Sequence, residues 1–250
     1  MDNLLEALFD WYFVSIDLLL IVGTIYFFKL PKEKKQSRFY WLPFLILAFT
    51  VLYENLGAVI FYNPDFNAWV NKILGNTVYP QFNIWFFNIT NRYCSTILYL
   101  FLIKTWLEPS KQRYLNWMIL GYILLGIIFL VTGYEPIYLN QPVTFAVGAN
   151  MILAGSGLYF IGLITYEKYL AADPIRLLSF WQMTTILFTY SVTYINSVSI
   201  TYLYEVNPQL GVSLINIDMI MSILNLFILM LIVVSPNLKW IKEEPLYGSH

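Results

Sequence analysis

LINIDMIMSILNLFILMLIVV, residues 214–234, is the stretch that decides the fold class of this chain. Asp218 is its one ionisable residue in 21 positions. A bilayer core roughly 30 Å thick needs about 20 apolar residues in an α-helix, and this stretch has that length. Because backbone amides in lipid must be paired within their own segment, the stretch is expected to be helical. The sequence therefore predicts an integral membrane protein.

Six further stretches have the same character, and the composition agrees with them. The chain has 250 residues, of which 59% are hydrophobic and only 12% charged, about half the charge of a typical soluble domain. We therefore predict an all-α fold, a single transmembrane domain of about seven helices over residues 1–250. The other expected spans are 7–28, 40–62, 82–106, 115–131, 145–165 and 178–202.

The basic residues predict the orientation, because cytoplasmic loops of membrane proteins are enriched in Lys and Arg. Of the 14 basic residues, 12 fall on one side of the predicted spans: Lys29, Lys32, Lys34, Lys35, Arg38, Lys104, Lys111, Arg113, Lys168, Arg176, Lys239 and Lys242. Lys72 lies in a loop on the other side, and Arg92 lies within a span. An odd number of spans then places the N-terminus outside and the C-terminus in the cytoplasm.

One loop, between the second and third spans, contains an amphipathic segment. Residues 65–74 carry Phe66, Trp69 and Ile73 at helical spacing, with Asp65 as an expected N-terminal cap and Gly75 as an expected end. Such a helix is expected to lie flat on the outer membrane surface. It is either an interfacial anchor or a lid over a cavity.

Four ionisable residues lie well inside predicted spans, at a cost of roughly 2.5–3.5 kcal/mol each at a helix centre. They are Asp17, Glu54, Arg92 and Asp218. Each lies between the outer end and the middle of its span, by the 1.5 Å rise of an α-helix. Since such groups usually face the bundle interior, we expect them to gather in the outer half of the protein.

Polar neighbours at offsets of three, four or seven extend these positions along helix faces. We predict a ligand or ion pocket open to the outside and formed by Asp17, Glu54, Asn88, Asn91, Arg92, Asn196, Asp218, Ser222 and Asn225. A polar stripe is expected along the sixth span, from Gln182, Thr185, Thr189 and Thr193.

The charge balance of these groups is uneven, with three carboxylates for one guanidinium. Arg92 stays protonated and can satisfy one acid, and we expect that acid to be Glu54 or Asp17. The other acids must be protonated, hydrated or paired with a cation, Asp218 above all. The alternative is that the polar groups hold the helices together, at around 0.6 kcal/mol per contact.

Three glycines in the fifth span, Gly148, Gly155 and Gly162, are spaced by seven and share one helix face. A glycine face lets another helix approach closely. Two partners are compatible with this pattern: a neighbouring helix of the same bundle, or a second copy in a homo-oligomer.

The sequence lacks the residues that several functional classes require. The chain has one cysteine, Cys94, and one histidine, His250, within an ending (Gly248, Ser249, His250) that can be appended rather than native. A disulfide, a metal site and a cofactor are therefore not expected. A retinal protein needs a lysine in its last span, which residues 214–234 lack. The near-neutral charge, 14 basic against 15 acidic residues, gives no reason to expect nucleic acid.

Three functions are compatible with this sequence. The first is a non-enzymatic sensor or accessory subunit that binds a ligand in the outer pocket and acts through a cytoplasmic or membrane partner. The second is a small transporter or cation pathway that uses the buried carboxylates. The third is an intramembrane acid–base enzyme. The Lys29-to-Arg38 loop is expected to contact anionic lipid or a cytoplasmic partner, in what the composition indicates is a bacterial inner membrane.

Overall fold

The computed structural model describes residues 2–166 and 173–238. Four residues used in the predictions, Lys168, Lys239, Lys242 and His250, lie outside these ranges together with Gly248 and Ser249. The described residues are helical with no strand, so the prediction of an all-α protein is confirmed. Five helices are long and apolar enough to cross a membrane, which indicates an integral membrane protein.

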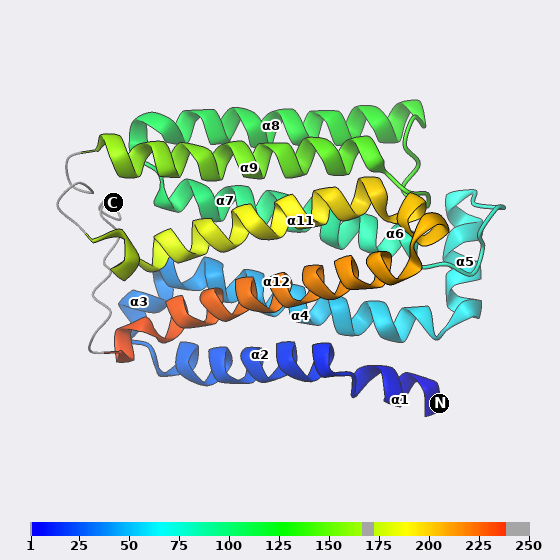
Figure 1. Ribbon diagram of the computed structural model, residues 1–250, viewed down its shortest axis with the longest axis horizontal. Helices are drawn as coiled ribbons and strands as arrows, with labels where there is room; N and C mark the ends of the chain where they lie inside the picture. The colour runs from blue at the N-terminus through cyan, green and yellow to red at the C-terminus, as the bar shows by residue number, and fades with distance from the viewer. Residues whose placement is uncertain (1, 167–172, 239–250) are drawn as a thin grey trace.

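The chain forms an elongated bundle with two distinct ends (Figure 1). The five membrane-length helices are α2 (Trp11–Lys29), α4 (Arg38–Phe61), α8 (Pro109–Thr132), α9 (Pro142–Thr165) and α12 (Pro208–Val234). Two further elements run beside them: α11 (Leu178–Val206), and a rod made of α6 (Ile84–Phe87), η1 (Asn88–Ser95) and α7 (Thr96–Trp106). The remaining short helices cap the two ends.

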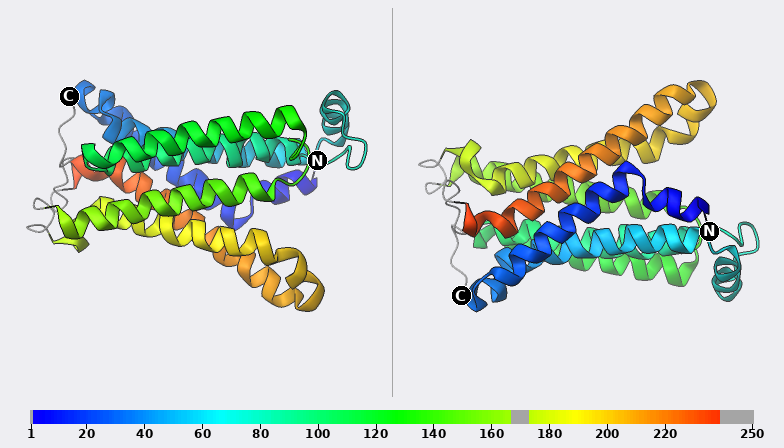
Figure 2. Two further views of the ribbon diagram at one scale, coloured as in Figure 1. Left: turned by 90° about the horizontal axis from the view of Figure 1, so that it is seen from above. Right: turned by 90° about the horizontal axis from the view of Figure 1, so that it is seen from below.

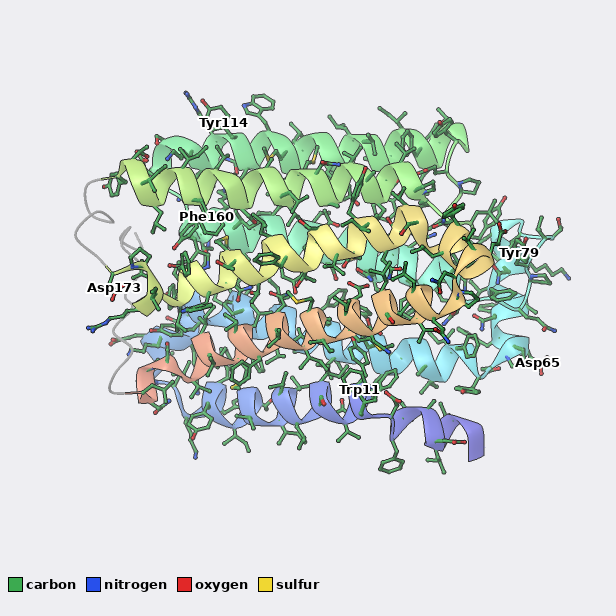
Figure 3. The ribbon with its side chains drawn as sticks, viewed as in Figure 1. Trp11, Asp65, Tyr79, Tyr114, Phe160 and Asp173 are labelled. Atoms are coloured by element: carbon green, nitrogen blue, oxygen red, sulfur yellow. The ribbon has the colours of Figure 1, made fainter. Side chains whose placement is uncertain are left out.

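We name the two ends by their short helices. The α5 end carries α5 (Pro64–Leu74) and α1 (Asp2–Leu8). The α3 end carries α3 (Lys32–Gln36), η2 (Pro174–Arg176) and η3 (Ser235–Asn237). Asp65 and Tyr79 lie at the α5 end and Asp173 at the opposite one (Figure 3).

Several predicted spans differ from the observed helices at their N-terminal ends. The first span is broken near Asp10, whose side chain accepts a hydrogen bond from the Tyr12 amide and so starts α2. The fourth, fifth and seventh begin several residues earlier than expected, each at a proline in the first turn. Proline is favoured there because that position has no helical amide bond to lose.

The third predicted span is not a regular α-helix. Its middle, Asn88–Ser95, is a π-helix, which forms i→i+5 hydrogen bonds. Such segments are rare and often occur at functional sites. This one carries Asn91, Arg92 and Ser95, three of the polar residues of the span, and it sets their directions.

Helix α5 lies across the end of the bundle (Figure 1). Its asparagine side chains bond backbone carbonyls of neighbouring segments. Asn67 and Asn71 are fully buried, whereas Trp69 and Ile73 are more than half exposed. Asn63, rather than the predicted Asp65, caps the helix by accepting from the Phe66 amide, and Gly75 ends it in the left-handed conformation at φ +82°. The apolar side of α5 thus faces away from the protein.

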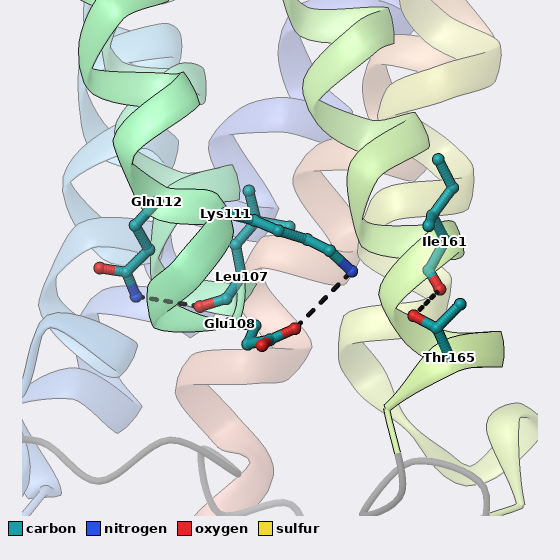
Figure 4. Close-up of polar contacts among 6 residues, drawn as sticks. All are labelled: Leu107, Glu108, Lys111, Gln112, Ile161 and Thr165. Atoms are coloured by element: carbon teal, nitrogen blue, oxygen red, sulfur yellow. Dashed lines mark hydrogen bonds and ion pairs between the residues drawn. The ribbon is translucent and has the colours of Figure 1, made fainter.

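The α3 half of the bundle contains a dense apolar core. Several helices contribute fully buried side chains to it, among them Leu47, Leu100, Ile103, Leu115, Leu229 and Ile232. The rim at this end is polar (Figure 4): Lys111 pairs with Glu108 at 3.7 Å, and the Gln112 amide donates to the Leu107 carbonyl.

The glycine face of α9 packs inside the bundle. Gly148 faces Thr96 and Tyr122, Gly155 faces Leu115 and Ile103, and Gly162 faces Lys111. All three glycines are buried within the chain. This face is therefore not available to a second copy, and the oligomer contact considered for it is not supported.

Gly155 and Gly157 provide a matched test of this packing. A Cβ at Gly155 would lie 3.2 Å from Leu115 Cδ1, whereas one at Gly157 meets nothing within 4 Å. Gly155→Val is expected to destabilise the protein by about 1–3 kcal/mol through overpacking. Gly157→Val should stay within about 0.5 kcal/mol of the parent. Thermal unfolding of the two purified variants measures the difference, and equal melting temperatures would show that α9 is not tightly packed there.

Candidate functional site

A cavity of about 260 Å³ lies in the α5 half of the bundle. Helices α11 and α12 diverge there from the other helices (Figure 2). Its lining is polar and aromatic and comes from α2, α4, the η1–α7 rod, α9, α11 and α12. The lining residues are Tyr12, Thr50, Tyr53, Glu54, Asn91, Ser95, Tyr99, Phe145, Thr189, Tyr190, Thr193, Ile215, Asp218, Met219, Ser222 and Asn225.

The structure brings together part of the predicted pocket. Glu54, Asn91, Asp218, Ser222 and Asn225 line the cavity, joined by Thr189 and Thr193 of the α11 stripe. The other predicted residues, namely Asp17, Asn88, Arg92, Asn196, Gln182 and Thr185, do not belong to the lining. Two of them, Asn196 and Gln182, bind residues that do.

Asp218 is held by side chains of α11. Its Oδ1 accepts from the Thr193 hydroxyl at 2.5 Å and its Oδ2 from the Asn196 amide at 3.5 Å. One turn further along α12, Ser222 interacts with the hydroxyl of Tyr12 from α2. The four-residue spacing of Asp218 and Ser222 thus places both on the cavity face of α12, as the α-helical period requires.

Glu54 enters the cavity from α4. It interacts with the neighbouring Tyr53 hydroxyl, and it lies near enough to Asp218 for the two carboxyl groups to repel each other. No Lys, Arg or His is among the described residues that line the cavity. The cavity therefore contains two carboxyl groups with no basic side chain in its described lining.

A hydrogen-bonded cluster closes the cavity toward the apolar core. The buried Asn225 donates to the Tyr99 hydroxyl at 2.5 Å and accepts from the Gln182 amide at 2.8 Å. Tyr99 packs edge to face with Tyr190, with ring centroids 5.5 Å apart. We call Tyr99, Asn225 and Gln182 the floor of the cavity, because the fully buried Leu100 and Leu229 follow Tyr99 and Asn225 along their helices toward the α3 end.

Arg92 does not form the predicted ion pair with Glu54 or Asp17. Its guanidinium donates to the Gln141 carbonyl at 2.5 Å and to Asn140 Oδ1 at 2.6 Å, both before α9, and lies over the Phe145 ring.

Asn88, one turn before Arg92, donates to the carbonyls of Ile137 and Leu139. The π-helix therefore directs both side chains to the α8–α9 loop, where they fix the loop rather than form the cavity.

Asp17 lies outside the cavity on the face of α2 that packs against α4. Its Oδ1 accepts from the Asn55 amide at 2.9 Å, and the same amide group bonds the Val51 carbonyl. This contact links two helices, which is the holding role that was considered as the alternative for all the buried polar groups. That role accounts for Asp17 but not for the unpaired charge at Glu54 and Asp218.

Glu135 is a buried carboxylate that the sequence patterns did not identify. It is 5% exposed, and its oxygens accept from the amides of Val143 and Thr144 and from the Thr144 hydroxyl, at 2.7–2.8 Å. It caps the N-terminus of α9, where free amides and the helix dipole favour an anion. Pro142 marks the start of α9 in the sequence. No sequence pattern indicates that Glu135, seven residues before Pro142, caps this helix.

The described residues contain no group of three or more His, Cys, Asp or Glu side chains that could hold a metal ion. Cys94 is a free, half-buried thiol of the π-helix and does not line the cavity.

Comparison with protein-family models, with curated proteins and with solved structures gave no match. The function is therefore inferred from the cavity and its charge.

Proposed function

We propose that the protein crosses the membrane seven times, with its N-terminus outside and its C-terminus in the cytoplasm. The passes are the five membrane-length helices together with α11 and the α6–η1–α7 rod. The distribution of charge supports this orientation. The α3 end carries the basic residues of the loops, for example Lys32, Lys35 and Arg113, whereas the α5 end carries Lys72 alone among the described Lys and Arg of the loops.

We further propose that the protein is a non-enzymatic sensor or accessory subunit that binds a small polar ligand in the cavity. The observation that carries this proposal is the one-sidedness of the cavity. Its polar lining stops at the floor, and the core beyond it is apolar and fully buried. A conduction pathway needs polar groups along its whole length. A cavity that ends at a packed core is better suited to binding than to passage.

The proposed output is a change in helix packing that reaches a partner at the cytoplasmic side. Helices α11 and α12 support this role, because each contributes to the cavity and then continues to the α3 end. The basic loop around α3 lies at that end, where a cytoplasmic protein or anionic lipid headgroups of a bacterial inner membrane can contact it.

A transporter is the second candidate, and one observation favours it. The Gln182 Oε1 atom of the floor and the Ser156 Oγ atom of α9 are buried without a hydrogen-bond partner among the described residues. Such atoms become satisfied if water or a substrate reaches them. A rearrangement that joins them to the cavity would create a continuous polar route.

Reconstitution in liposomes distinguishes the two candidates. We expect vesicles that contain the protein to release H⁺, Na⁺ and K⁺ gradients at the same rate as empty vesicles, because the apolar core blocks passage. The rates are measured with pH-sensitive and cation-sensitive dyes inside the vesicles. A gradient loss that requires the protein and disappears in Glu54→Gln would refute the sensor proposal and support transport.

A further inference from the structure

We infer that the cavity binds a small organic molecule through an ammonium group. This inference rests on the proposed function, since it names the chemical class of the ligand for the same cavity. Three features of the lining carry it: two carboxylates without a counter-ion, tyrosine rings around them, and a buried hydroxyl without a partner.

The charge of the lining favours a cation. Glu54 of α4 and Asp218 of α12 both line the cavity. Buried anions are stable when they are paired, and a ligand that carries positive charge would supply the missing partner. Arg92, the basic residue within a predicted span, is engaged with Gln141 and Asn140 and is not a lining residue. The described lining therefore supplies no positive charge of its own, and a cationic ligand would supply it.

The rings of the lining favour an organic ammonium ion over a bare metal ion. Tyr12, Tyr53, Tyr99 and Tyr190 all contribute to the wall. Aromatic faces attract alkylammonium groups, and several rings together form the cages that bind quaternary ammonium ligands. A divalent cation such as Ca²⁺ takes six to eight oxygen ligands. The described residues offer no cluster of three carboxylate, thiol or imidazole groups for a metal ion.

An independent observation also indicates an absent polar ligand. Ser95 is 2% exposed, it lines the cavity, and its Oγ has no hydrogen-bond partner among the described residues. Buried polar atoms are nearly always satisfied, so an unpaired hydroxyl on a cavity wall marks a place for a ligand or water atom. Ser95 belongs to the π-helix, whereas the carboxylates come from α4 and α12. A ligand that carries both an ammonium group and a hydroxyl would satisfy the carboxylates and Ser95 together.

Choline and its neutral isostere 3,3-dimethyl-1-butanol provide a test, because they share shape and hydroxyl and differ in charge. Isothermal titration of the purified full chain is expected to show binding of choline. The neutral compound is expected to bind at least about tenfold more weakly than choline. The difference arises because it lacks the cation–π and charge contacts that the ammonium group forms away from water. Glu54→Gln and Asp218→Asn should each weaken choline binding by about tenfold.

Asp17→Asn is the matched control, because Asp17 is a carboxylate within a span but outside the cavity. It should bind choline as the parent does, and thermal unfolding verifies that all three variants are folded. Equal binding of the neutral compound, with no effect of Glu54→Gln and Asp218→Asn, overturns the ammonium inference but leaves ligand binding by the cavity intact. Ethanolamine, a smaller ammonium compound with a hydroxyl, is titrated in the same way. If neither choline nor ethanolamine binds, the ammonium inference is also overturned. Protein-dependent uptake of choline into liposomes would instead support the inference and refute the sensor proposal.

Discussion

Glu135→Ala is expected to destabilise the protein by about 3 kcal/mol, because hydrogen bonds to a buried charge are among the strongest in proteins. The substitution leaves the amides of Val143 and Thr144 and the Thr144 hydroxyl without their acceptor. It also removes the electrostatic attraction between Glu135 and Arg92. Both effects act at the same loop, so α9 should fray at the α5 end. Unfolding of the purified protein by heat or by SDS measures the loss.

Glu108→Ala is the control for this prediction. Glu108 also lies just before a helix, α8, but its side chain caps no amide and forms only the 3.7 Å pair with Lys111 at the rim. Such a pair contributes at most about 1 kcal/mol. If the two variants unfold alike, the Glu135 cap does not stabilise α9, and the buried carboxylate needs another explanation.

Asn225→Leu is expected to cost about 2–4 kcal/mol, because it leaves two buried polar groups unsatisfied at roughly 1–3 kcal/mol each. The Tyr99 hydroxyl loses its donor and the Gln182 amide loses its acceptor. Leucine has a similar size, so the loss comes from hydrogen bonding more than from packing. The expected result is a lower unfolding temperature and a floor that no longer closes the cavity.

Asn150→Leu makes the same chemical change at an exposed site. The Asn150 amide donates only to the Ala146 carbonyl of its own helix, so its loss should stay within about 0.5 kcal/mol. A double-mutant cycle adds a second measurement. In the Tyr99→Phe background, Asn225→Leu should cost less than in the parent, because the partner hydroxyl is already absent. Additive losses would show that Tyr99 and Asn225 do not interact energetically.

The regular helices of the site could be predicted from the sequence. Asp218, Ser222 and Asn225 share a face at offsets of four and three, and all three line the cavity. Glu54 joins them because an ionisable side chain in a membrane is excluded from lipid. Hydrophobic length and helical period alone determine these positions, so no knowledge of the neighbouring helices is needed.

The third span could not be predicted in the same way, because its pattern assumes a constant period. A π-helix changes the direction of every side chain that follows it. Asn91 and Ser95 therefore reach the cavity, whereas Asn88 and Arg92 reach the α8–α9 loop. The predicted pairing of Arg92 with Glu54 or Asp17 was wrong for this reason. A loop carbonyl can satisfy a guanidinium, and carbonyls leave no signal in a sequence.

The contacts of the α5 end were also beyond prediction, since they join asparagine side chains to backbone carbonyls far along the chain. Asn71 bonds the carbonyls of Pro80 and Phe82, Asn67 bonds that of Ile60, and Asn83 bonds that of Gly57. Asparagine is common in loops for several local reasons. Only the folded chain shows which of these residues hold α5 against the bundle.

This manner of holding α5 determines how the α5 end responds to its surroundings. Carboxamides carry no charge and do not titrate, so their bonds to carbonyls are insensitive to acidity, and salt does not screen them as it screens ion pairs. An ion-paired cover would loosen in brine or acid. The cover made by Asn67, Asn71 and Asn83 should keep its shape across such conditions, which in the proposed orientation suits an end that faces an environment the cell does not control.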